Sequence, residues 1–253
     1  MTKAFVLLSG GIDSTTCLFD ALKNYDEVEA VSINYGQKHF KETEFANATC
    51  KAQGVEHRIL DIRGLLDGNG VMLTDAETSI PSIDYSDIEG VSPTYVPFRN
   101  GTLLSIIAAQ AQKWVMAEID RRKDDMNAHD YAGKHFTDQE LLDMMRDSSA
   151  VYLGAHAEDA HNWAYPDCTP EFNGAMANAI YTGTYYTVRL RTPLLNMTKQ
   201  EVIEYGYSMG VDWKSTWSCY AGGEKHCGEC PTCRARKQAF IAAEIPDPTE
   251  YAV

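Results

Sequence analysis

The chain has 253 residues, enough for one domain with a sizeable buried core. Its net charge of −14 at pH 7 argues against a nucleic-acid substrate, whose phosphates require a basic surface. The longest apolar stretch, around residues 103–111, is too short to cross a bilayer, and no signal-peptide pattern precedes the first predicted strand. We therefore expect a cytoplasmic protein, without membrane contact, whose seven cysteines are reduced thiols or metal ligands.

The first predicted elements form a strand, a glycine turn and a helix. An apolar run over residues 4–8 predicts a buried strand ending at Leu8, and an amphipathic helix is predicted from Ser14. Gly10 and Gly11, in the turn between them, let the backbone approach a ligand closely, and a helix N-terminus offers unpaired N–H groups. With hydroxyls at Ser9, Ser14 and Thr15, the turn is predicted to bind phosphate, although an ordinary strand–turn–helix is the alternative.

This turn differs from a Walker A loop. It has no lysine to reach a terminal phosphate, and it carries Asp13 instead. An acidic residue beside phosphates is useful if it binds Mg²⁺ on a departing pyrophosphate. The residues therefore favour cleavage of a nucleotide that releases pyrophosphate.

Strands and helices alternate along the rest of the chain. Strands are predicted at 4–8, 28–34, 57–62, 150–154 and 187–191, and helices near 14–24, 40–53, 100–119, 170–182, 198–209 and 233–243. Thr137 with Glu140, and Thr198 with Glu201, are capping boxes that open helices. This alternation predicts an α/β fold with a doubly wound parallel sheet and ligands at the carboxyl ends of the strands.

Two stretches do not fit the alternation. Residues 64–98 are rich in glycine and proline, and a loop of that length usually covers a site. Residues 118–148 are densely charged, and we expect a peripheral helical insertion there that takes no part in catalysis.

Four of the seven cysteines predict a metal site. Cys219, Cys227, Cys230 and Cys233 are spaced C-x7-C-x2-C-x2-C, and four thiolates complete a tetrahedral shell. Structural zinc is favoured, and an iron–sulfur cluster is the serious alternative because four cysteines also hold such clusters. His226, between two of these cysteines, is expected to be a solvated loop residue. Cys17 and Cys50 lie in helical patterns and are expected in the core, and Cys168 is either a packed thiol or a wall of the site.

Residues 9–14, Ser-Gly-Gly-Ile-Asp-Ser, resemble the pyrophosphate loop of the N-type ATP pyrophosphatase superfamily, which splits ATP into AMP and pyrophosphate. Further segments resemble one family within it, the 7-cyano-7-deazaguanine synthases of queuosine biosynthesis. These segments are residues 35–39 (YGQKH), 96–100 (VPFRN), Asp159, 165–168 (YPDC), 171–172 (EF), 192–194 (TPL), 198–199 (TK) and 216–220 (TWSCY), which leads into the cysteine cluster. The resemblance covers nearly the whole chain.

The resemblance implies a fold and a reaction. The fold is Rossmann-like, of the adenine nucleotide alpha-hydrolase type, with a synthetase domain over 1–210 and a zinc knuckle with a C-terminal helix over 211–253. The reaction converts 7-carboxy-7-deazaguanine, ATP with Mg²⁺, and ammonium to 7-cyano-7-deazaguanine through an adenylated acid, an amide and an adenylated amide. The resemblance also implies a structural zinc ion and a homodimer.

The same resemblance implies roles for individual residues. Leu8, Ser9, Gly10, Gly11, Asp13, Ser14, Thr15 and Tyr35 bind ATP; Arg99, Asn100, Asp159, Asp167, Glu171 and Phe172 bind the deazaguanine; and Asp13, Arg99 and Lys199 serve catalysis. For Asn100 a helix cap, for Asp167 and Glu171 a solvated loop, and for Lys199 a surface position are the plain alternatives.

Two other functions remain open from the sequence. A related ligase could stop at the amide or transfer the activated deazaguanine to another acceptor. A zinc-dependent nucleic-acid-binding module on a degenerate scaffold is the second alternative, which the intact loop and the negative charge oppose.

Overall fold

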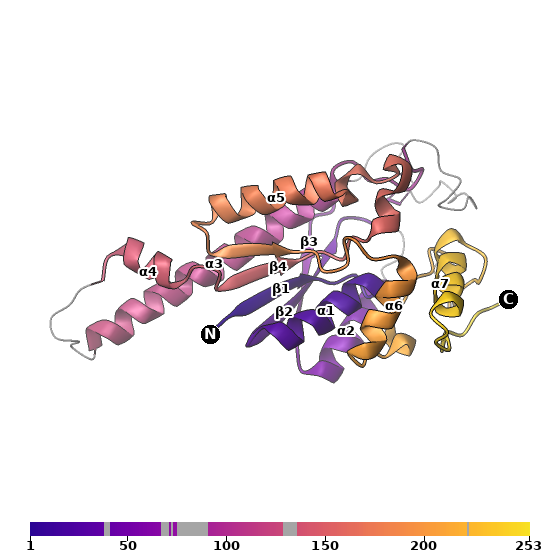
Figure 1. Ribbon diagram of the computed structural model, residues 1–253, viewed down its shortest axis with the longest axis horizontal. Helices are drawn as coiled ribbons and strands as arrows, with labels where there is room; N and C mark the ends of the chain where they lie inside the picture. Colours follow the sequence, from indigo (N-terminus) through magenta and orange to yellow (C-terminus); the bar gives the residue numbers. More distant parts are fainter. Residues whose placement is uncertain (38–40, 67–70, 72, 75–90, 129–135, 222) are drawn as a thin grey trace.

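The centre of the computed structural model is a five-stranded parallel sheet in the order β3–β2–β1–β4–β5 (Figure 1). The strands are β1 (Lys3–Leu7), β2 (Glu27–Asn34), β3 (Glu56–Asp61), β4 (Ser149–Tyr152) and β5 (Val188–Arg191). The structure describes residues 1–37, 41–66, 71, 73, 74, 91–128, 136–221 and 223–253. All five predicted strands are present, so the predicted parallel sheet is confirmed.

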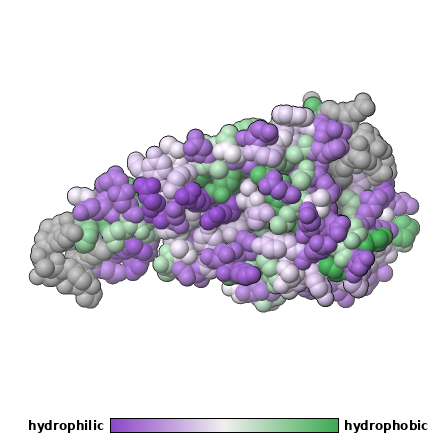
Figure 2. All heavy atoms as spheres, in the orientation of Figure 1, coloured by the Kyte–Doolittle hydropathy of each residue, from purple (hydrophilic) through white to green (hydrophobic). Residues whose placement is uncertain are grey.

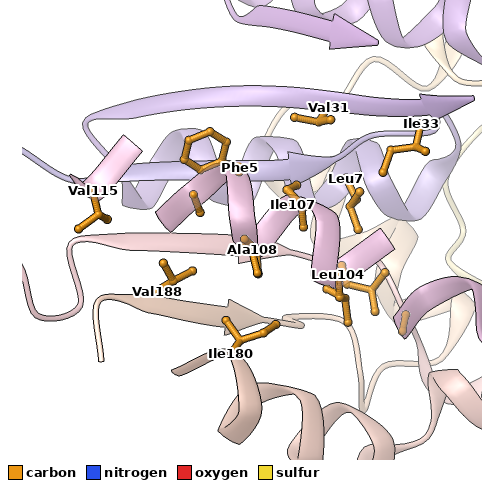
Figure 3. Packing of buried hydrophobic residues seen from close by; sticks show 14 of the residues in the cluster. Phe5, Leu7, Val31, Ile33, Leu104, Ile107, Ala108, Val115, Ile180 and Val188 are labelled. Atoms are coloured by element: carbon orange, nitrogen blue, oxygen red, sulfur yellow. The ribbon is translucent and has the colours of Figure 1, made fainter. Parts of the chain in front are cut away.

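Alternate residues of the strands pack into two separate cores. Phe5 and Leu7 of β1 face the layer of α3 (Arg99–Ala128) and α5 (Pro170–Gly183), where they contact Leu104 and Ile107 (Figure 3). Ala4 and Val6 belong to the other core, which includes residues of α1 (Ile12–Asn24), α2 (Lys41–Gln53) and α6 (Lys199–Ser208). Because neighbouring residues of a strand point to opposite faces, helices cover both sides of the sheet, as a doubly wound fold requires.

The predicted helix starts are mostly confirmed. Both capping boxes form, Thr198 with Glu201 at the start of α6 and Thr137 with Glu140 at the start of α4 (Asp138–Met144). The last helix, α7 (Pro231–Ala242), follows the cysteine cluster. Short 3₁₀ turns at Ala157–Trp163, Pro166–Cys168 and Trp213–Ser215 complete the described secondary structure.

The charged segment 118–148 is helical where it is described. α3 runs to Ala128, nine residues beyond the predicted end, because Glu118 pairs with Arg121 and Arg122 one turn later. The end of α3 and α4 project from the sheet (Figure 1), and hydrophilic residues predominate on the face seen in Figure 2. Leu141, Leu142 and Met145 are nonetheless buried, so this part of the chain also adds to the core.

The sheet places the site. β1 lies between β2 and β4, so the chain leaves β1 toward one side and its later strands continue on the other. Ligands of such sheets bind at the carboxyl ends of the strands where the order reverses, which here are β1 and β4. Among the described residues, no helix is long and apolar enough to span a membrane.

Candidate active site

The turn after β1 is held by its own hydroxyls and by a distant backbone group. Ser9 and Ser14 share a hydrogen bond of 3.0 Å, and the Ser9 N–H donates to Ser14 Oγ at 3.1 Å. The carbonyl of Gly10 accepts a hydrogen bond from the Trp217 N–H at 2.8 Å. α1 begins at Ile12, two residues before the predicted start, so Asp13 lies in its first turn. The turn therefore presents a helix N-terminus to its surroundings, as anion binding requires.

Gly10 is required by the geometry of this turn. Its φ is +91°, and a Cβ at this position would collide with the backbone carbonyl of Glu42. We expect Gly10→Ala to lower the free energy of unfolding by about 2–5 kcal/mol, from the left-handed conformation and the collision together.

Gly174 in α5 gives the matched control for this prediction. No heavy atom lies within 4 Å of a Cβ built there. Gly174→Ala should raise stability by roughly 0.5–1 kcal/mol, since alanine restricts the unfolded chain more than glycine does. Urea unfolding of both variants tests the pair, and a Gly10→Ala protein as stable as the parent would contradict the assignment.

A charged network joins the first turn of α1 to the ends of β4 and α6. Lys199 Nζ donates to both carboxylate oxygens of Asp13, each at 2.6 Å. His156 Nε2 lies 3.3 Å from Lys199 Nζ and 3.2 Å from Asp159 Oδ1. Burial alone would raise the pKa of Asp13, but the charges of Lys199 and His156 and the Lys199 hydrogen bond outweigh it, so this pKa is lowered. Asp13 is consequently ionised at neutral pH.

Arg99 begins α3 at the opposite side of the site. Burial opposes its charge, but Tyr35, Cys168, Asp167 and Tyr220 act electrostatically in the other direction and raise its pKa. A guanidinium held in this way is a strong anion site, because it stays charged and offers a planar set of donors.

Asn100, the residue after Arg99, holds the loop that follows β4. Its backbone N–H donates to Asp167 Oδ2 at 2.9 Å, and its side-chain amide donates to Asp167 O at 3.2 Å and to Cys168 Sγ at 3.3 Å. Asn100 is therefore inside the helix and does not cap it. Among the described residues, the second carboxylate oxygen of Asp167 is buried without a hydrogen-bond partner.

These residues surround one cavity of about 340 Å³. Ten of the residues predicted to bind ATP, to bind substrate or to serve catalysis line it: Leu8, Ser9, Gly11, Asp13, Ser14, Tyr35, Arg99, Asn100, Asp159 and Lys199. Gly10, Thr15 and Asp167 lie behind this lining, and the hydroxyl of Thr15 has no partner among the described residues.

Two predicted substrate residues, Glu171 and Phe172, are not part of the cavity lining. Glu171 is exposed on the first turn of α5, where Phe172 packs edge-on against Phe98 at 5.8 Å between centroids. Most of the predicted covering loop, 64–98, lies outside the described residues, although Leu73 lines the cavity.

The four predicted metal ligands come together beside this cavity. The Sγ atoms of Cys219, Cys227, Cys230 and Cys233 all lie within 4.8 Å of one another. Cys219 also lines the cavity, and its sulfur accepts hydrogen bonds from the N–H groups of Ala221 and Cys227, each at 3.3 Å. The cluster therefore forms one wall of the site and is suited to a metal.

The other three cysteines lie outside the cluster. Cys17 and Cys50 are buried in the core as predicted, and Cys168 is both a packed thiol and part of the cavity wall.

The expectation of a solvated His226 is wrong. Only 5% of this residue is exposed, and its Nε2 accepts a hydrogen bond from the Ser218 N–H at 3.1 Å. Its ring lies 4.2 Å from that of Trp217, and Tyr251 packs on its other side. Burial, followed by the charge of Arg236, lowers the pKa of His226 to about 4. The histidine is buried because the backbone around Tyr251 pairs with His226 itself. The residues next to His226 in the sequence give no sign of this long-range contact.

Several residues of the site were not predicted from the sequence, and three of them bear on its geometry or charge. Glu42, in the first turn of α2, lines the cavity, but in the sequence it is an ordinary acid at a helix start. Gly154, after β4, lets the chain pass the first turn of α1, since a Cβ there would lie 3.0 Å from Ser14 N. His156 lies between Lys199 and Asp159 and contacts both. Its position just after a predicted strand could have marked it as a site residue.

Comparison with known proteins gives a consistent result. The model of the family described as queuosine biosynthesis protein QueC matches residues 3–134 and 136–244. The chain is 37% identical over 251 residues to the 7-cyano-7-deazaguanine synthase of Caldicellulosiruptor bescii, covering 99% of this chain and 98% of that protein. It is 39% identical over 251 residues to the enzyme of the same name from a Marinomonas species, with 98% of each covered. A third, from Thermoplasma acidophilum, is 37% identical over 256 residues, covering 98% of this chain and 92% of that one. With the glycine turn after β1, the charged cavity and the four-cysteine cluster in place, the chain belongs to the QueC family.

Proposed function

We propose that this chain converts 7-carboxy-7-deazaguanine and ammonium to 7-cyano-7-deazaguanine at the expense of ATP, as the names of its relatives indicate. One observation supports this most directly. A single cavity contains the helix N-terminus after β1 together with the cations Arg99 and Lys199. Such a cavity suits a nucleoside triphosphate beside a second anion, here the carboxylate of the deazaguanine.

The residues divide into a nucleotide side and a substrate side. We assign Ser9, Gly10, Gly11, Ser14 and Thr15 to the phosphates, and Leu8 and Tyr35 to the nucleoside. Asp13 would hold Mg²⁺ on the pyrophosphate, and Lys199, now paired with Asp13, is close enough to take over charge on the leaving phosphate. Each group is now the counter-ion of the other at 2.6 Å, so Mg²⁺ on Asp13 and a phosphate on Lys199 would replace this ion pair by two others.

The substrate side begins at Arg99. We assign it the carboxylate of the deazaguanine, since a guanidinium binds a carboxylate through two parallel hydrogen bonds. Asn100, Asp159, Asp167, Glu171 and Phe172 are proposed to position the heterocycle. Asn100 and Asp159 line the cavity. Asp167 lies behind that lining, and its buried Oδ1, which has no partner among the described residues, could accept a ring or amino N–H that reaches it.

The proposed chemistry uses ATP twice. The carboxylate attacks the α-phosphorus of ATP and displaces pyrophosphate, which turns a poor leaving oxygen into AMP. Ammonia displaces AMP to form the amide. The amide oxygen attacks the α-phosphorus of a second ATP and displaces pyrophosphate, and loss of AMP and of two protons from nitrogen leaves the nitrile. The cations of the cavity stabilise charge that develops on the α-phosphate.

The cysteine cluster is proposed to bind one zinc ion. Zn–S bonds of about 2.3 Å in a tetrahedron place the sulfurs about 3.8 Å apart. The Cys227 and Cys233 sulfurs are 3.9 Å apart, so the geometry fits. Four thiolates fill the coordination shell, so the ion would hold α7 and the wall of the cavity together.

The assembly proposed from the family resemblance is a homodimer.

Product analysis tests the proposed function. Purified protein with 7-carboxy-7-deazaguanine, ATP and ammonium should give the nitrile, with two AMP and two pyrophosphate per nitrile, because Asp13 and the lysine-free turn favour cleavage between the α and β phosphates. Mass spectrometry of the heterocycle and nucleotide chromatography measure both. ADP with orthophosphate in place of AMP would refute adenylation, and an amide as the final product would favour the ligase that stops one step earlier.

A further inference from the structure

Glu42 is a half-buried acidic residue of the cavity wall with no role in the binding scheme above. It lies in the first turn of α2, and its backbone carbonyl packs against Gly10 in the phosphate-binding turn. Its side chain lines the same cavity as Asp13 and Arg99. Glu42 thus lies in the cavity wall, next to the glycine turn and within electrostatic range of Arg99.

The other acidic groups of the cavity are already engaged. Asp13 accepts two hydrogen bonds from Lys199, Asp159 faces His156, and Glu158 accepts from the Lys199 N–H at 2.8 Å. Glu42 is different, because among the described residues only burial and the charge of Arg99 act appreciably on its carboxyl group. A carboxylate without such partners keeps its lone pairs for a proton of the substrate.

The environment of Glu42 also sets its acidity. The other charged groups that line the cavity are Asp13 on α1, Arg99 on α3, His156, Glu158 and Asp159 after β4, Lys199 on α6 and Arg236 on α7. The remaining titratable groups there are Tyr35, Tyr220, Cys168 and Cys219. Burial raises the pKa of Glu42 to about 7, with Arg99 acting in the opposite direction. A general acid–base group works best when its pKa lies near the working pH.

The proposed reaction requires a proton acceptor at nitrogen in both halves. When the lone pair of ammonia attacks the acyl-adenylate carbon, the new C–N bond leaves a positively charged nitrogen, which must lose a proton as the C–O bond breaks and its electron pair leaves with AMP. In the second half, the adenylated amide carries two N–H protons. One is lost to give the imidate, and the other is lost as the C–O bond to AMP breaks and the nitrile forms. None of these proton losses is needed for adenylation of the acid.

We propose that Glu42 is the catalytic base that removes protons from nitrogen during amide and nitrile formation. This inference rests on the proposed function, since it assigns a residue to its nitrogen steps. The Glu42 carboxylate accepts each proton and returns it to solvent or to AMP between steps.

The test separates adenylation from the nitrogen steps in Glu42→Gln. The control variant is Glu44→Gln, which changes an exposed acid in the same turn of α2. Exchange of labelled pyrophosphate into ATP, dependent on 7-carboxy-7-deazaguanine, reports adenylation. Conversion of the preformed amide to nitrile reports the proton losses from nitrogen. This assay needs no ammonia, so the titration of ammonium does not affect its pH profile.

We expect Glu42→Gln to keep exchange within about threefold of the parent and to lose about 10²-fold or more in conversion of the amide. In the parent, that conversion should rise with pH through about 7, as the carboxylate form appears, and Glu42→Gln should lack this rise. Glu44→Gln should match the parent in all three measurements. Equal losses of exchange and amide conversion in Glu42→Gln, or amide conversion within threefold of the parent, would overturn the proposal. Absence of exchange in the parent itself would instead refute the proposed adenylation, and with it this role.

Discussion

Asp13→Asn is expected to abolish turnover, with substrate-dependent release of AMP falling at least about 10³-fold. The carboxylate accepts two hydrogen bonds of 2.6 Å from Lys199, and its pKa is lowered, so the group is an anion at the centre of the cavity. A neutral amide of the same shape removes the negative charge that Mg²⁺ on pyrophosphate would need. It also leaves Lys199 without its counter-ion.

The matched control is Asp120→Asn, which removes an exposed carboxylate on α3. It should keep full activity. Circular dichroism should show the fold of Asp13→Asn unchanged. The two side chains have nearly equal volume, and β1 and α1 are held in the core by other residues. Nucleotide chromatography measures the AMP. If Asp13→Asn releases AMP at the parent rate, Asp13 has no part in the reaction.

Cys230→Ser is expected to lose the metal and to melt about 10 °C or more below the parent. Cys230 precedes α7, and its sulfur lies within 4.8 Å of those of the other three cysteines. A serine hydroxyl is a poor ligand for zinc, and metal binding to such a cluster is folding free energy. A loss of several kcal/mol in a domain of this size lowers the melting temperature by this amount.

Activity of Cys230→Ser should fall as a consequence of the same loss. Ser218 and Cys219 line the cavity, and the N–H of the preceding Trp217 donates to the carbonyl of Gly10. Cys50→Ala, a buried thiol away from the cluster, is the control and should keep one metal per chain. Metal analysis should find zinc in the parent, and iron with visible absorbance would favour a cluster instead. If Cys230→Ser melts like the parent but is inactive, the ion is catalytic and its structural role is refuted.

The sequence alone predicted the elements whose determinants are local. The strand–turn–helix at residues 4–24 follows from an apolar run, two glycines and an amphipathic stretch. The capping boxes at Thr137 and Thr198 follow from residues three positions apart, and both form. Three of the four clustered cysteines follow from two C-x2-C spacings, which keep Cys227, Cys230 and Cys233 close in the chain, and Cys219 joins them across a seven-residue loop. The resemblance of motifs to one family supplied the reaction.

Other features depend on contacts between segments far apart in the sequence. Glu42 faces the cavity because α2 packs on the turn at Gly10, and nothing in residues 40–53 shows which side chain points there. The Trp217 N–H and Gly10 carbonyl, 207 positions apart, meet only when the cysteine cluster docks on the sheet. His226 is buried because the last residues of the chain pair beside it. Local patterns fix hydrogen bonds within a turn or helix, whereas the burial and charge of a side chain are set by neighbours that only the folded chain brings close.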